Sequence, residues 1–314
     1  MSTKISIITP SFNQSRFLEE SILSVLNQNY SNLEYLLIDG FSTDRSIEII
    51  KKHQEKIKFW VSEKDNGQSQ AINKGFKKAT GEIIAWLNSD DILLPNTLHA
   101  VEDFFLKNPT VDLVYGDVIN FDEYGIETYY HVKEFELCDF ISRNSIHQPS
   151  VFFKKKLLDK VGLLDETLNY CMDYDLWMRI FLNYNTFKVN IPLAKFRIHT
   201  RSKTSSNPKG LYKEYRKILS IFFNSFKDSD LILQLQKYGV YDNPYDKTYN
   251  YFSSEFPLQK LIQIYLHACA VQEYSWGNIL KANQLFLKSI QHPSIRLNLL
   301  FLLKNNLGLK RLFS

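Results

Sequence analysis

Cysteine is scarce in this chain of 314 residues: Cys138, Cys171 and Cys269 are widely separated, and no two form a CxxC pair. A disulfide framework or a structural zinc site is therefore not expected, and a reducing compartment fits better. No apolar run is long enough to span a bilayer, and the first residues resemble a strand rather than a signal peptide. These absences predict a cytoplasmic protein.

The sequence also lacks a large excess of charge of one sign, and it lacks glycine-rich phosphate-binding loops. The formal net charge is only +4, which is too small to indicate a nucleic-acid partner. Neither GxGxxG nor GxxxxGK[ST] follows a predicted strand, which counts against a dinucleotide site or a P-loop. The sequence has no internal repeat and no low-complexity segment.

The first 122 residues alternate between buried-strand runs and helical periodicity. Strands are expected at 5–12, 33–40, 57–63, 82–91 and 111–122, and helices at 15–28, 42–54, 67–80 and 95–108. Strands that are apolar on both faces and alternate with helices predict a mostly parallel sheet covered on both sides. In such sheets ligands bind beyond the carboxyl ends of the strands, and here every such end is polar.

The second half has a different character. Residues 130–200 mix short strands and helices, and a basic, serine-rich stretch follows at about 205. Amphipathic helices are expected at 211–226, 258–274 and 279–290, before a basic, apolar tail at 292–314. The tail suits either an anionic membrane surface or packing on the core or on another subunit, as in a homo-oligomer.

The segment LNSDD places Asp90 and Asp91 directly after an apolar strand. Adjacent carboxylates suit a hard divalent cation, whose charge relieves their mutual repulsion. A solvated turn with one aspartate capping the next helix explains the segment equally well. Asp39 follows another buried strand, where it either accepts hydrogen bonds from a nucleobase or belongs to an ordinary turn.

Two later segments carry candidate chemistry. In CMDYDLWMRIF, Asp173 and Trp177 lie one helical turn apart, and so do Asp175 and Arg179, which predicts an ion pair. Asp173 at the start of an apolar helix suits a general base, or simply a helix cap. His199 stands in the basic segment FRIHTRSKT, where it is either structural or a ligand for a metal or a phosphate.

The order of these segments, rather than any one of them, resembles the family 2 glycosyltransferases with the GT-A fold. The resemblance extends over about residues 3–205 through ISIITPSFN, EYLLIDGFSTDRS, SEKDNGQSQAINKG, GEIIAWLNSDD, MDYDLWMRI and FRIHTRSKT. It implies a Rossmann-like α/β nucleotide-binding sandwich at 1–204, divided into a nucleotide-sugar half, 1–120, and an acceptor half, 121–204. A helical region, 205–314, follows.

The resemblance also implies an inverting transferase that uses Mn²⁺ or Mg²⁺, a nucleotide-sugar donor and a glycan or lipid-linked saccharide acceptor, at the inner face of the membrane or in the cytoplasm. Asp173 would be the base, and Asp90, Asp91 and His199 would hold the metal. Donor-binding positions would be Thr9, Pro10, Phe12, Asp39, Asp65, Asn73, Asn88 and Asp90. His147, Gln148 and Tyr170 are acceptor-site candidates.

Two positions depart from the family pattern and keep a non-catalytic interpretation open, and a second enzyme class is also an alternative. Asn88 stands where the acidic motif often starts with aspartate, and Gln70 stands at a position that is often acidic in relatives. A nucleotidyltransferase is one alternative, because it also holds a nucleotide with carboxylates and Mg²⁺. A non-catalytic sugar-binding protein on a decayed transferase domain is the other.

Overall fold

The computed structural model describes residues 2–200, 202–243, 247–250 and 257–289. The chain forms two compact units, one of residues 1–134, 145–218 and 250–252 and the other of residues 135–144, 219–249 and 253–314. The predicted division at residue 204 stays a prediction. No helix in the described part of the chain is both long and apolar enough to cross a membrane.

The first unit is built on a nine-stranded sheet in the order β3-β2-β1-β4-β8-β6-β9-β5, with β7 beside β6. The strands are β1 (Ile5–Ser11), β2 (Leu33–Asp39), β3 (Phe59–Ser62), β4 (Ile83–Trp86), β5 (Ile92–Leu93), β6 (Leu113–Asp122), β7 (Glu127–Tyr130), β8 (Val151–Lys154) and β9 (Thr186–Ile198). The ladders β3-β2, β2-β1, β1-β4 and β6-β9 are parallel, whereas β5, β7 and β8 run antiparallel to their neighbours. The predicted mostly parallel α/β sheet is confirmed.

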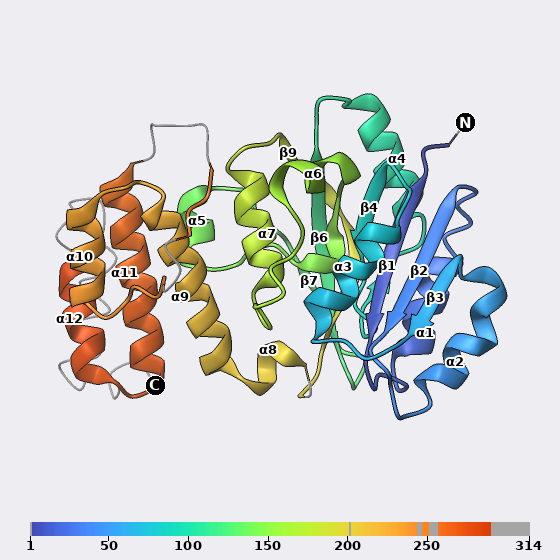
Figure 1. The fold of residues 1–314 in the computed structure, drawn as a ribbon, viewed down its shortest axis with the longest axis horizontal. Coiled ribbons are helices and arrows are strands. Elements are labelled where there is room, and N and C mark those ends of the chain that lie inside the picture. The colour runs from blue at the N-terminus through green and yellow to red at the C-terminus, as the bar shows by residue number, and fades with distance from the viewer. Residues whose placement is uncertain (1, 201, 244–246, 251–256, 290–314) are drawn as a thin grey trace. The chain divides into compact units, whose positions relative to one another are not determined.

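Helices lie along both faces of this sheet (Figure 1). They are α1 (Leu18–Leu26), α2 (Ser46–His53), α3 (Gln68–Lys78), α4 (Thr97–Lys107), α6 (Leu158–Val161) and α7 (Met172–Phe181), and the short helix α8 (Lys203–Ser206) follows β9. One face packs α1, α2 and α4 against apolar strand residues in a continuous core. On the other face Gly75 lets α3 approach β1, because a Cβ there would lie 2.4 Å from the Ile8 side chain.

The second unit is helical. It contains α5 (Leu137–Ser142), α10 (Ser229–Lys237), α11 (Leu258–Ser275) and α12 (Ile279–Ser289), while α9 (Pro208–Asn224) begins in the first unit and ends in the second. The helices predicted at 211–226, 258–274 and 279–290 are therefore confirmed as α9, α11 and α12. The predicted tail at 292–314 lies outside the described residues.

The strand predicted at 82–91 is shorter than expected. It ends at Trp86, and the acidic residues after it form a turn before the two-residue strand β5. The reason is that β5 pairs antiparallel with β9 instead of continuing the β4 ladder. The two aspartates therefore lie in a connection between two strand partners, a suitable place for polar side chains at the edge of a ligand site.

Candidate functional site

A cavity of about 490 Å³ lies at the carboxyl ends of β1, β2 and β4. The start of α3, the end of β9 and the start of α8 complete its walls. The lining residues are Pro10, Ser11, Phe12, Gln14, Gly40, Asp65, Gly67, Gln68, Ala71, Asn88, Ser89, Asp90, Asp91, Phe196, Arg197, Ser202 and Lys203. Six of the predicted donor and metal residues thus meet at one cavity: Pro10, Phe12, Asp65, Asn88, Asp90 and Asp91.

The two adjacent aspartates are held from β9. The backbone N–H of Arg197 donates to Asp91 Oδ1 at 3.0 Å, and the Arg197 Nε donates to the Asp90 carbonyl at 2.8 Å. Asp91 is 1% exposed, and its Oδ2 has no hydrogen-bond partner among the described residues. Burial, followed by the charge of Asp90, raises the pKa of the Asp91 carboxyl well above its usual range.

Arg197 is itself fixed by its surroundings. Its guanidinium forms an ion pair with Glu20 of α1 and lies 4.6 Å from the ring centroid of Phe17 and 4.2 Å from that of Phe121. Such stacking favours a guanidinium over a lysine ammonium. Because Arg197 is held by Glu20, Phe17 and Phe121, its hydrogen bonds to Asp90 and Asp91 give the acidic turn a defined position at the cavity wall.

His199 contacts the acidic turn through Asp90. Its Nε2 lies 3.0 Å from Asp90 Oδ2, and its ring packs at 4.9 Å from that of Phe17. The side chain is buried, and its Nδ1 has no partner in the described part of the chain. The structure therefore places His199 as a direct neighbour of Asp90, and its role as a metal ligand stays a prediction.

A divalent cation fits the acidic turn only in part. No group of three or more His, Cys, Asp or Glu side chains in the described ranges is arranged to hold a metal. The unpartnered, buried Oδ2 of Asp91 nevertheless supplies an oxygen ligand of the kind that Mg²⁺ and Mn²⁺ prefer. Because Mg²⁺ usually combines one or two carboxylates with substrate phosphates, two aspartates are sufficient protein ligands.

Two other polar residues of the cavity wall, Asp65 and Asn88, accept hydrogen bonds from residues at the start of α3. Asp65 Oδ1 accepts from the backbone N–H of Gly67 at 2.9 Å, and a Cβ on Gly40 would lie 2.8 Å from Asp65 Oδ2. A side chain at position 40, directly after β2, would therefore displace the Asp65 carboxylate from this position. Asn88 Oδ1 accepts from Gln68 Nε2 at 2.7 Å, which joins the acidic turn to α3.

Three predicted donor residues do not line the cavity. Asp39 is fully buried and accepts from the backbone and hydroxyl of Ser42 and from the Ser62 hydroxyl, at 2.8, 2.6 and 2.7 Å. Thr9 is buried and accepts from the Tyr35 hydroxyl at 3.0 Å. These groups order the strand ends beneath the cavity, and direct contact with a nucleotide stays a prediction for both.

Asn73 is the third of these residues. Its side chain exchanges two hydrogen bonds of 3.0 Å with the backbone of Leu164 and donates to Glu166 at 3.0 Å. Gln70, the second departure from the family pattern, also donates to Glu166 at 3.0 Å. Both α3 amides therefore hold the loop between α6 and α7 in this structure.

The predicted base and acceptor residues lie in other elements of the same unit. Asp173 is half-buried in the first turn of α7, where its Oδ1 accepts from the Tyr174 N–H at 2.8 Å. His147 packs between the rings of Tyr130 and Phe196, at 4.5 and 5.1 Å, and its burial lowers its pKa to about 4. Phe196 also lines the cavity, so His147 lies directly behind its wall.

Gln148 and Tyr170 take part in backbone and side-chain contacts. Gln148 donates to the Trp86 carbonyl at 2.6 Å, while its own Oε1 has no partner in the described residues. The Tyr170 hydroxyl accepts from Asn207 at 2.9 Å. Gln148 thus lies at the end of β4, and Tyr170 lies in the loop that precedes α7.

The sequence did not indicate Glu20, which pairs with Arg197, or Glu214, whose carboxylate accepts from the backbone N–H groups of residues 169–171. Glu20 lies in an amphipathic helix and Glu214 in another, where acidic residues normally face solvent. No local pattern distinguishes them, because their partners are far away in the sequence. The predicted ion pair of Asp175 and Arg179 is confirmed at 2.7 Å, and both side chains are largely buried rather than exposed.

Comparison with known proteins agrees with this geometry. The model of the family described as glycosyl transferase family 2 matches residues 6–162. An uncharacterized glycosyltransferase of Methanocaldococcus jannaschii is 32% identical over 67% of this chain and 77% of its own length. An uncharacterized glycosyltransferase of Rickettsia typhi is 27% identical over 73% of this chain and 74% of its own.

Solved structures share the fold. TarS of S. aureus, residues 1–349 in complex with UDP-GlcNAc, superimposes with a TM-score of 0.63 at 17% identity, over 91% of this chain and 79% of that one. The mannosyltransferase PcManGT of Pyrobaculum calidifontis, in complex with GDP-Man and Mn²⁺, gives a TM-score of 0.54 at 18% identity, over 99% and 82%.

Proposed function

We propose a reaction for this chain, which belongs to glycosyltransferase family 2. The chain transfers a hexosyl or N-acetylhexosaminyl group from a nucleotide-diphosphate donor. The acceptor is a hydroxyl of a glycan or lipid-linked saccharide. The reaction inverts the anomeric centre, and its product belongs to a polysaccharide or surface glycan. A UDP-sugar is the favoured donor.

One observation carries this proposal: the buried acidic turn at the wall of the 490 Å³ cavity. Asp91 presents a carboxylate oxygen that no described protein group satisfies, and an unsatisfied buried oxygen costs about 1–3 kcal/mol or more. A divalent ion held by Asp90 and Asp91 removes this cost, and His199 fixes Asp90 beside it. When bound, Mn²⁺ or Mg²⁺ supplies positive charge against the donor diphosphate.

The protein groups have separate tasks in the transfer. The acceptor oxygen attacks the anomeric carbon as the bond from that carbon to the diphosphate oxygen breaks, and the nucleoside diphosphate leaves with the electron pair. Asp173 takes the acceptor proton, which makes the hydroxyl a better nucleophile. A single displacement inverts the anomeric centre, and no enzyme nucleophile is required.

Residues that line the cavity are the proposed contacts for the parts of the donor. Pro10 and Phe12 line the cavity at the end of β1 and are the proposed neighbours of the nucleobase, while Asp65 and Asn88 are those of the ribose and sugar. Asp39, Thr9 and Asn73 do not line the cavity. Binding of a base edge by Asp39, as proposed, would require it to exchange its bonds to the Ser42 and Ser62 hydroxyls. His147, Gln148 and Tyr170 are the proposed acceptor-side residues.

Likeness to solved structures supports the choice of donors to test, since TarS was solved with UDP-GlcNAc and PcManGT with GDP-Man and Mn²⁺. We expect one of UDP-glucose, UDP-GlcNAc, a dTDP-sugar or GDP-mannose to raise the melting temperature in the presence of Mn²⁺ and to be hydrolysed slowly with water as acceptor. EDTA should remove both effects. Absence of turnover of every donor, with no response to EDTA, would mean that the chain is a non-catalytic binding protein.

A further inference from the structure

The loop between α6 and α7, residues 162–171, leads directly into the helix turn that carries Asp173. The carboxylate of Glu214 in α9 accepts hydrogen bonds from the end of this loop. Its Oε1 accepts from the Asn169 N–H at 2.8 Å, and its Oε2 accepts from the Tyr170 and Cys171 N–H groups at 2.7 and 3.0 Å. Three successive amides thus converge on one side chain, two residues before Asp173.

These bonds replace a local helix cap. Cys171, the residue at the N-cap of α7, makes no side-chain capping bond, although its thiol donates to the Leu211 carbonyl at 3.4 Å. Charge-assisted hydrogen bonds from backbone N–H groups to a carboxylate are about twice as strong as neutral ones. The start of α7 is therefore positioned from α9, an element more than 30 residues further along the chain.

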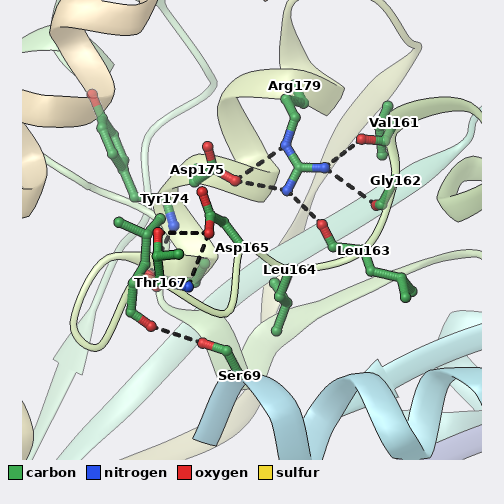
Figure 2. A network of polar contacts seen from close by, with 12 residues as sticks. Ser69, Val161, Gly162, Leu163, Leu164, Asp165, Thr167, Tyr174, Asp175 and Arg179 are labelled. Carbon is green, nitrogen blue, oxygen red and sulfur yellow. Dashed lines mark hydrogen bonds and ion pairs between the residues drawn. The ribbon is translucent and has the colours of Figure 1, made fainter. Parts of the chain in front are cut away.

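The remainder of the loop is held on its other sides. Figure 2 shows the Arg179 guanidinium directed at the carbonyls of Val161, Gly162 and Leu163 while it pairs with Asp175. Ser69 of α3 donates to the Leu168 carbonyl at 2.9 Å. The first part of the loop is thus fixed by α7 and α3, whereas the backbone N–H groups of its last three residues are bound by Glu214.

The same residues border the donor cavity. Lys203, a cavity residue, donates to the Asn169 carbonyl at 3.2 Å. A Cβ on Gly67, another cavity residue, would lie 3.8 Å from Asn169 Oδ1. A displacement of residues 169–171 would therefore move Asp173 relative to the donor site.

We propose that Glu214 is a positioning residue for the reaction, which sets the place of the Asp173 carboxylate relative to the donor without touching substrate. This inference rests on the proposed function, in which Asp173 is the base. Glu214 lies beyond residues 6–162, the part matched by the family model. The first turns of α9 thereby help to position the proposed base.

The test uses the full-length chain and the variants E214A and E214Q, with K213A as the matched control from the exposed neighbouring position of α9. Donor hydrolysis by water is measured with Mn²⁺ and with UDP-glucose, UDP-GlcNAc or GDP-mannose, whichever the wild type turns over. Binding of UDP or GDP is measured by calorimetry, which also gives the fraction of protein molecules that bind nucleotide. Each kcat is divided by this fraction, and all measurements are made well below the melting temperature of each variant.

We expect E214A to lower kcat about tenfold or more, because misplacement by about 1 Å can cost a factor of 100, while nucleotide affinity stays within about twofold. E214Q retains one acceptor oxygen, so its kcat should fall between E214A and the wild type. K213A should behave as the wild type.

Other outcomes overturn the inference in distinguishable ways. If E214A and E214Q melt at a lower temperature but keep kcat per competent molecule, Glu214 is merely structural. If E214A weakens nucleotide binding as much as it lowers kcat, the effect is not specific to the base. If the wild type turns over donor but D173N does so equally well, the role of Asp173 fails and that of Glu214 with it. A wild type without turnover rejects the proposed function itself.

Discussion

Asp91 is the residue whose surroundings most directly require a ligand. Its carboxylate is buried, adjacent to another carboxylate, and satisfied at only one oxygen by a described hydrogen-bond donor. Two such carboxylates repel each other in a low-dielectric environment unless a proton or a cation intervenes. The raised pKa of Asp91 favours the proton when no cation is bound, and the proposed cation would relieve the same repulsion.

We predict that D91A abolishes the Mn²⁺-dependent part of nucleotide binding, because it removes the unpartnered carboxylate oxygen. Calorimetric titration of UDP with and without Mn²⁺ measures this effect. D103A is the control, since Asp103 forms only an exposed ion pair with Lys107 on α4. An unchanged, metal-dependent affinity in D91A would reject the assignment.

For the base, we predict that D173N keeps donor binding and loses transfer by a factor of about 10² or more, because the amide cannot accept the proton. Initial rates of donor turnover and the calorimetric affinity for UDP provide the two readouts. D159N, at an exposed position of α6, serves as the control. Near-normal turnover in D173N would place the base elsewhere.

At the scale of elements, a buried carboxylate joins three segments at the end of the sheet opposite the cavity. Glu34 of β2 accepts from Ser6 of β1 at 2.5 Å and from the backbone and hydroxyl of Thr80, before β4, at 2.6 Å each. Burial alone would raise its pKa, but these hydrogen bonds and Lys4 outweigh burial and lower the pKa to about 2.

Glu34 should therefore make folding sensitive to acid. Its pKa in the folded state is about 2 against an ordinary value of 4.5, so its contribution is present above pH 4.5 and is lost as the pH falls toward 2. We predict that the free energy of unfolding falls by about 2 kcal/mol less over this range in E34Q than in the wild type. Urea titrations at several pH values measure this difference, with E48Q as an exposed control. An equal dependence of the free energy of unfolding on pH in E34Q and in the wild type would contradict the prediction.

At the scale of the whole molecule, the first unit extends past the predicted boundary at residue 204 and includes Glu214 of α9. The predicted membrane contact of the tail has a separate test. If the tail binds an anionic membrane, the full chain floats with anionic liposomes and a variant lacking residues 293–314 floats less, because basic residues near the surface contribute about 1 kcal/mol each. Equal flotation would favour packing on the protein instead.

The sequence alone determined the order of the elements and the polar character of the strand ends. Apolar runs and helical periodicity are local properties, and they indicated the parallel sheet, the late helices and the pair of Asp175 and Arg179, which are one turn apart. They also located Asp90 and Asp91 at a strand end. Motif order then indicated the family without any knowledge of contacts.

Only the tertiary structure decided which polar groups are satisfied and by what. It gave Asp39 and Asn73 internal partners, placed His199 against Asp90, and left one oxygen of Asp91 without a partner in the described residues. It also brought Glu214 to the loop before Asp173, more than 40 residues away in the sequence. Hydrogen-bond partners depend on where the chain returns in space, and no local pattern of residues records that return.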